Sequence, residues 1–96
     1  MMILVSYDVS TKTPAGVTRL RKIAETCVDH GIRVQNSVFE CQVEPDQWER
    51  FKDALLRLYK AEEDSLRFYR LQEPRDAHVE EHGVNKTVFF DDPLII

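Results

Sequence analysis

The residue most able to do chemistry in this chain is a carboxylate at the end of an apolar segment. Asp8 lies within Ile3–Val9, and the hydroxyls of Ser10 and Thr11 and the ammonium of Lys12 follow it. A charge on such a strand needs a partner or a purpose, because removing a carboxylate from water is costly. Two interpretations stay open: a strand-end aspartate that caps the amides of the next loop, or an oxygen ligand for a hard divalent cation.

A metal site at Asp8 requires more than one protein chain. Mg²⁺ prefers octahedral oxygen coordination and is commonly held by one or two carboxylates together with waters and substrate phosphate. A two-fold homodimer brings a second Asp8 close to the first, and a small domain gains from the apolar area that such a dimer buries. Under the metal-ligand interpretation, paired Asp8 residues are the predicted metal-binding and catalytic carboxylates, with Mg²⁺ as cofactor and Mn²⁺ as its substitute.

Basic side chains gather just after this carboxylate. Four lie between Val9 and Ala24 with no acidic residue among them, although the whole chain has a net charge of −4. Because Lys and Arg at phosphates supply most nucleic-acid affinity, any contact with nucleic acid must be local. The predicted nucleic-acid-binding residues are Lys12, Arg19, Lys22 and Arg33. The alternative is an ordinary solvated helix face, on which Arg19 and Lys22 point outward.

Amides and a hydroxyl interrupt the apolar segment Arg33–Val43 near Asn36 and Ser37. The segment is predicted as one bent strand or as two short strands that break at this point. A β-bulge at a sheet edge is one explanation. A dimer seam whose register is fixed by side-chain hydrogen bonds is the other, and composition does not separate them. For the second explanation the interface residues are Gln35, Ser37 and Phe39.

Hydrophobic periodicity predicts the elements that must position these residues. Thr13 and Pro14 are typical of a helix start, and Gly31 is predicted to end that helix in the left-handed conformation. The predicted elements are a strand at Ile3–Val9, a helix at about residues 14–30, one or two strands in Arg33–Val43, a helix from Pro45 and a strand at Ser65–Leu71.

This order of elements predicts an α+β fold, a ferredoxin-like βαββαβ sandwich with a C-terminal strand extension, which forms a homodimer. Residues 1–73 make the ferredoxin-like domain. Residues 74–96 are predicted to add short strands at Val79–Val84 and Lys86–Phe90 and a tail that packs on the dimer partner. No apolar run is long enough to span a membrane and no targeting segment is evident, which predicts a cytoplasmic protein without a membrane partner.

Five segments, in this order and spacing, resemble those of a known family. They are Leu4–Val9, Arg19–Lys22, Arg33–Glu40, Ser65–Leu71 and the ending Asp91–Ile95. Together they are similar to the small CRISPR-associated adaptation proteins, and the ending is similar to the type I-C branch of that family.

The resemblance implies a homodimer that bridges two dimers of the CRISPR integrase and holds a double-stranded DNA prespacer for insertion into the repeat array. It also implies a metal-dependent endonuclease on single-stranded RNA or double-stranded DNA, because the family's metal-binding aspartate matches Asp8. The family's basic helix positions fall at Arg19 and nearby, and its Gln-x-Ser-Val-Phe strand falls at Gln35–Phe39. One alternative is a purely structural DNA-binding and bridging protein. Another is a small-molecule-sensing module, for which no residue specifies a ligand.

Overall fold

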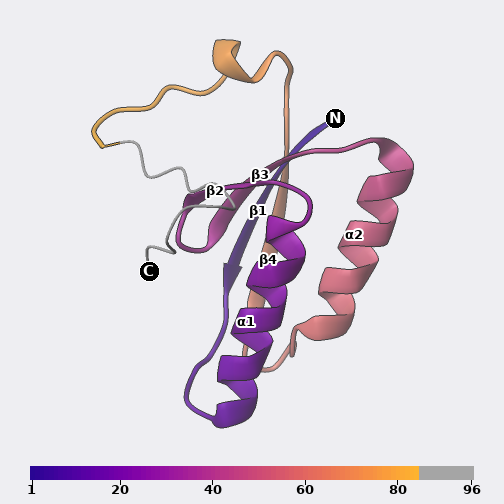
Figure 1. Cartoon of the computed structure of the whole chain (residues 1–96), viewed down its shortest axis with the longest axis vertical. Coiled ribbons are helices and arrows are strands. Elements are labelled where there is room, and N and C mark those ends of the chain that lie inside the picture. The colour runs from indigo at the N-terminus through magenta and orange to yellow at the C-terminus, as the bar shows by residue number, and fades with distance from the viewer. Residues whose placement is uncertain (85–96) are drawn as a thin grey trace.

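The computed structural model describes residues 1–84 as four strands and two helices (Figure 1). The strands form one antiparallel sheet, and both helices lie on the same side of it. The elements in chain order are β1 (Met2–Asp8), α1 (Pro14–Val28), β2 (Ile32–Gln35), β3 (Val38–Gln42), α2 (Pro45–Leu58), β4 (Ser65–Leu71) and a 3₁₀ turn at Arg75–Ala77. The predicted α+β, ferredoxin-like fold is confirmed.

The first strand lies inside the sheet, whose order is β2-β3-β1-β4. β1 therefore has a hydrogen-bonded neighbour on both sides. At its end, Asp8 is the register partner of Ser65, the first residue of β4. The loop after β1 and the loop before β4 consequently meet at one end of the sheet.

The hydrophobic core fills the space between the sheet and the two helices. Alternation along β1 buries Ile3, Val5 and Tyr7 on the helix side, whereas Leu4 and Ser6 are half-buried on the other. The remaining large core side chains are Phe39 and Cys41 from β3, Ile23 and Cys27 from α1, and Phe51 and Leu55 from α2. Both cysteines are free thiols in this core, and burial raises the pKa of Cys41 to about 12.

Helix α1 begins as its sequence predicts and ends earlier than predicted. The Thr13 hydroxyl accepts a hydrogen bond from the amide of Gly16 at 3.1 Å, and Pro14 is the first helical residue. The helix ends at Val28, and the prediction of a left-handed Gly31 is wrong, since Gly83 is the glycine with positive φ among residues 1–84. Gly31 is required for close packing instead, because a Cβ there would lie 2.5 Å from the Cys41 Sγ.

The polar interruption near Asn36 and Ser37 is a turn between two separate strands, β2 and β3. The β2–β3 register also shifts between Arg33 and Gln35, so this edge of the sheet contains an irregularity as well. No strand forms at Val79–Val84. The predictions for Lys86–Phe90 and for the C-terminal tail concern residues outside the described part of the chain. Within residues 1–84, neither helix has the length and apolarity that crossing a membrane requires.

Candidate metal and nucleic-acid site

Asp8 lies at the end of β1, and its side chain is exposed. Side chains alternate along a strand, so Asp8 shares the sheet face of Leu4 and Ser6, which the helices leave uncovered (Figure 1). Tyr7, its neighbour, points the opposite way into the core. The open face of one copy therefore presents this carboxylate to a second copy or to a ligand.

A cleft of about 810 Å³ opens beside Asp8. Two loops line it, residues 9–13 after β1 and residues 61–65 before β4. Hydroxyls of Ser10, Thr11 and Ser65 and the ammonium of Lys12 come from these loops. The carboxylates of Glu62 and Glu63 line the cleft as well, so it offers oxygen ligands suited to a cation, and Lys12 is the one basic residue of its lining.

Asp64 holds the two loops together. Its carboxylate is fully buried and accepts hydrogen bonds from the backbone amides of Ser10 at 3.1 Å and Lys60 at 2.8 Å. It also accepts two bonds from the guanidinium of Arg19, from Nε at 2.8 Å and from Nη2 at 3.2 Å. The Arg19 guanidinium, followed by the two amides, lowers the pKa of Asp64 below its ordinary value. An ionised Asp64 therefore fixes the backbone that follows Asp8.

This arrangement argues against the interpretation of Asp8 as a cap of the next loop. The loop amide of Ser10 is bonded to Asp64 and not to Asp8. Across residues 1–84 the Asp8 side chain has neither a hydrogen bond nor an ion pair. Capping of the loop is thus done by Asp64, and the exposed carboxylate of Asp8 is available to a ligand. Sequence reasoning missed Asp64, whose position directly before a predicted strand was its one local signal.

Two of the four predicted basic contacts are engaged inside the fold, which corrects their expected placement. The Arg19 side chain is only 15% exposed and is paired with Asp64 and, at 3.3 Å, with Glu63. Arg33 is 9% exposed, and its guanidinium lies over the Phe39 ring with 5.1 Å to the centroid. Arg19 therefore stabilises the loops, and Arg33 lies beneath α1 rather than on the surface.

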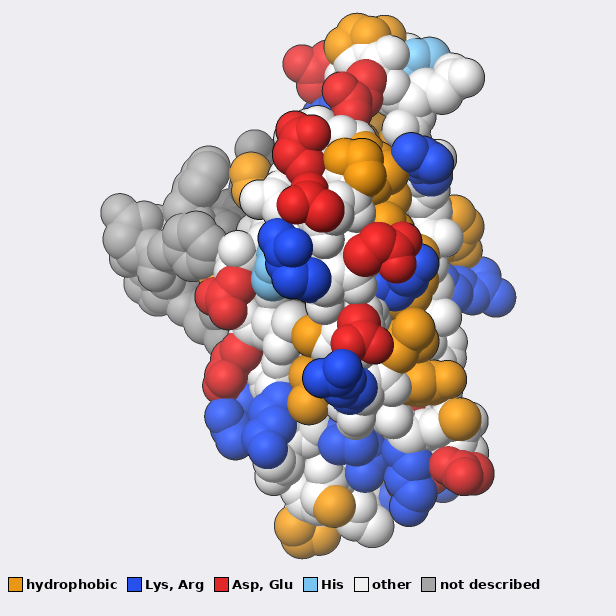
Figure 2. Space-filling view, turned by 90° about the vertical axis from the view of Figure 1, so that its right-hand side faces the viewer, with side chains coloured by type: hydrophobic (Ala, Val, Ile, Leu, Met, Phe, Trp, Pro, Cys, Tyr) orange, Lys and Arg blue, Asp and Glu red, His pale blue; other side chains and the backbone are white. Residues whose placement is uncertain are grey.

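The other two basic residues, Lys12 and Lys22, are exposed and belong to no ion pair within the described chain. Lys12 lines the cleft beside Asp8. Figure 2 shows Lys and Arg side chains gathered toward the lower end of the face in view and acidic side chains more often toward the upper end. The lower end is where Figure 1 places the start of α1 and the loop that leads to β4. The cleft itself is lined by more carboxylates than cations, with Lys12 as its one basic residue.

The three residues predicted for the dimer interface also differ in burial. Phe39 is completely buried in the core, where its ring stacks on that of Tyr7 at 6.3 Å, so its assignment to the dimer seam is corrected. Its register partner is Val5, another residue on the helix side. Gln35 is exposed and Ser37 is half-buried at the β2–β3 turn. Both stay predictions for the interface.

A metal ion fits the donor chemistry of this site only in part. No group of three or more His, Cys, Asp or Glu side chains could hold a metal within residues 1–84. One chain therefore offers the Asp8 carboxylate with nearby hydroxyls, which is half of the ligand set that Mg²⁺ commonly uses. A metal site at Asp8 would need its remaining ligands from a second copy or from substrate phosphate.

Comparison with known proteins shows to which family the chain belongs. The family model described as "CRISPR associated protein Cas2" matches residues 1–79. The chain belongs to the Cas2 family. The resemblance found in the sequence is confirmed, whereas the type I-C branch stays a prediction.

Individual Cas2 proteins are similar along the whole chain. A protein of Moorella thermoacetica named "CRISPR-associated endoribonuclease Cas2 1" is 53% identical to this chain. The alignment covers 100% of both proteins. A protein of Halalkalibacterium halodurans named "CRISPR-associated endonuclease Cas2" is 45% identical, with 99% of each chain covered. The crystal structure of Streptococcus pyogenes Cas2 at pH 6.5 has a TM-score of 0.77 and 51% identity, and covers 86% of this chain and 100% of its own.

Proposed function

We propose that this Cas2 protein is a metal-dependent endonuclease of CRISPR adaptation, in which two copies join their Asp8 carboxylates at one site. The observation that carries the proposal is an exposed, unpartnered Asp8 beside a cleft whose loops are fixed by buried Asp64. Two relatives are named as nucleases, one as an endoribonuclease and the other as an endonuclease, and these names support the proposed activity. The proposed substrate class is therefore a phosphodiester of RNA or DNA, and the proposed location of the reaction is the cytoplasm.

Each residue of the cleft has a role in this proposal. Asp8 holds the cation, and Asp64 keeps the backbone after Asp8 in place. The ammonium of Lys12 offsets the charge of the bound phosphate backbone. Mg²⁺ or Mn²⁺ held by Asp8 would supply Lewis-acid stabilisation of the charge that develops on the phosphate. The site is incomplete in one copy, so the homodimer is the active unit.

The experiment that tests this function is cleavage of labelled single-stranded RNA and double-stranded DNA by the purified dimer with Mg²⁺, with Mn²⁺ and with a chelator. We expect cleavage with either cation and a loss of at least roughly 100-fold after chelation, because the cation offsets transition-state charge that one carboxylate cannot. Equal cleavage with and without the chelator would exclude the metal-dependent mechanism.

A second function has its own observation in favour. Lys and Arg side chains gather toward the lower end of the face in Figure 2, and they support a structural role in which the dimer bridges CRISPR integrase dimers and holds a double-stranded prespacer. Binding of this kind does not require cleavage, so the two functions are compatible. The acidic total charge of −4 indicates that the isolated dimer binds DNA weakly and that the integrase supplies much of the contact.

The double variant Lys12→Ala/Lys22→Ala tests the DNA contact. We expect duplex affinity to fall by roughly tenfold at low salt, evenly across sequences, with a smaller salt dependence, because two phosphate contacts are lost. Fluorescence anisotropy with two duplexes of unrelated sequence measures this.

The matched control is Arg50→Ala/Lys52→Ala on α2, where both cations are already paired with Asp46 and Glu49. This control should bind DNA like the parent. If both double variants weaken binding equally, Lys12 and Lys22 are not specific contacts.

A further inference from the structure

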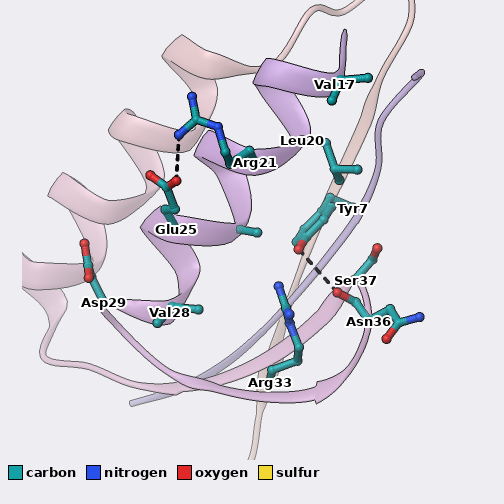
Figure 3. Close-up of a pocket in the computed structure, with 11 residues that line it drawn as sticks. Tyr7, Val17, Leu20, Arg21, Glu25, Val28, Asp29, Arg33, Asn36 and Ser37 are labelled. Atoms are coloured by element: carbon teal, nitrogen blue, oxygen red, sulfur yellow. Dashed lines mark hydrogen bonds and ion pairs between the residues drawn. The ribbon is translucent and has the colours of Figure 1, made fainter. Parts of the chain in front are cut away.

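A second concave site lies on the opposite side of the sheet from Asp8 (Figure 3). It is a groove of about 680 Å³ between α1, the end of β1 and the β2–β3 turn. Tyr7 lines this groove and Asp8 lines the cleft, so adjacent residues of β1 face the two sites. The groove has no part in the proposed nuclease site.

One wall of the groove is an apolar stripe along α1. It consists of Val17, Leu20, Ala24 and Val28, which recur at helical spacing on one side of the helix. The stripe extends over most of the helix, roughly 16 Å at 1.5 Å per residue. Val17 at its outer end is 53% exposed, so the stripe reaches the surface at the mouth of the groove.

The floor of the groove contains a buried positive charge. Arg33 points from β2 toward Tyr7 in Figure 3 and is 9% exposed. Its Nε is buried without a hydrogen-bond partner, and no carboxylate within residues 1–84 forms an ion pair with this guanidinium. A guanidinium removed from water is costly unless an anion compensates it. The face of the Phe39 ring, at 5.1 Å, offsets only part of that cost.

The other polar groups of the groove do not supply this anion. Glu25 at the rim is paired with Arg21 at 2.7 Å, as Figure 3 shows, and Asp29, the other carboxylate of the lining, forms no ion pair within residues 1–84. The Tyr7 hydroxyl donates a long hydrogen bond of 3.4 Å to the Asn36 carbonyl. Burial raises the pKa of Tyr7, so its phenol stays protonated and remains a donor. Among residues 1–84, the Arg33 guanidinium thus lies at the floor of the groove without a carboxylate partner.

We propose that this groove binds a small amphiphilic carboxylate. Its aliphatic body lies along the Val17–Val28 stripe, and its carboxylate accepts hydrogen bonds from the Arg33 guanidinium. Planar carboxylates match the fork of an arginine side chain and form charge-assisted bonds with it. The volume lies within the range of small-molecule pockets, which are mostly apolar with a few placed polar groups.

Nuclear magnetic resonance of the ¹⁵N-labelled full chain tests the proposal with three defined probes. Decanoate should shift the side-chain Nε–H signal of Arg33 and the amides that line the groove, in a saturable manner. Decan-1-ol has a similar aliphatic body without the charge and should bind at least about tenfold more weakly, since it loses charge-assisted hydrogen bonds. Acetate has the head group alone and should cause no saturable shift.

Two variants at exposed positions keep the test independent of folding. Val17→Glu places a negative charge at the mouth of the groove and should weaken decanoate binding about tenfold. The control Leu56→Glu makes the same kind of change at an apolar α2 residue that is 45% exposed and lies outside the groove. It should bind decanoate like the parent.

Three results would overturn the proposal. The first is equal affinity for decanoate and decan-1-ol, because Arg33 would then contribute nothing. The second is equal loss of binding in both glutamate variants. The third is the absence of any decanoate-induced shift together with groove signals that change on protein dilution, which would show that a second copy of the chain covers the groove.

Discussion

Replacing Asp8 with Asn is expected to lower cation-dependent cleavage of RNA and DNA by roughly 10²–10³-fold. Asparagine has nearly the shape of aspartate but carries no charge, so the proposed pair of Asp8 side chains would lose its attraction for Mg²⁺. The Asp8 side chain is exposed and makes no hydrogen bond within residues 1–84, so the fold should be unaffected. Initial cleavage rates and thermal unfolding, measured on the same preparations, separate these two effects.

Asp53→Asn is the matched control for this substitution. Asp53 is an exposed α2 carboxylate that pairs with Arg57 at 2.7 Å, away from the cleft. Its removal should leave cleavage within about twofold of the parent, because exposed ion pairs contribute little. Parental rates in the Asp8→Asn protein would assign the cleavage to another residue or to a contaminating enzyme.

The largest effect on stability is expected from Asp64→Ala. The substitution removes a fully buried carboxylate that accepts from Arg19, Ser10 and Lys60, and it leaves the guanidinium without its main partner. Breaking a buried pair of this kind costs about 3–5 kcal/mol of unfolding free energy. Urea unfolding followed by circular dichroism measures that difference.

Glu63→Ala is the control for the Asp64 variant, because it removes the other carboxylate on the same arginine. Glu63 is 33% exposed and its contact with Arg19 is 3.3 Å. Its loss should cost less than about 1 kcal/mol. A loss of equal size in both variants would show that Asp64 has no special role in fixing the loops.

The lowered pKa of Asp64 also predicts how stability depends on pH. The folded state holds this proton less tightly than the unfolded chain, whose aspartates titrate near pH 4. The stabilisation is therefore fully present above about pH 4 and is lost as the pH falls through the folded pKa. Asp64→Asn should flatten this acid limb of the stability curve, whereas Glu63→Gln should change it less.

Much of the fold could be predicted from sequence because its determinants are local. Alternation in β1 indicated which side chains enter the core, and the Thr13–Pro14 pair indicated where α1 starts. The exposed Asp8 at the end of a central strand followed from the same pattern. Periodicity and capping act over a few residues, so a single sequence contains them.

The placement of the arginines could not be predicted in this way. Arg19 and Asp64 are 45 residues apart, and no spacing rule links a helix position to a loop that packs against it. In sequence, Arg33 follows directly after the predicted first helix and Phe39 lies in a segment that amides interrupt, which favours a surface position and a seam position. The two residues are register partners in β2 and β3, however, and both are buried on the helix side. Only the pairing of the strands reveals which side of the sheet each of them faces.

The count of Mn²⁺ ions bound per chain tests most directly whether two Asp8 side chains complete one site. Electron paramagnetic resonance of free Mn²⁺ during a titration of the dimer gives this stoichiometry. The account predicts one tightly bound Mn²⁺ per two chains and its loss in Asp8→Asn, because each chain supplies a single carboxylate. One ion per chain, or undiminished binding by Asp8→Asn, would contradict it.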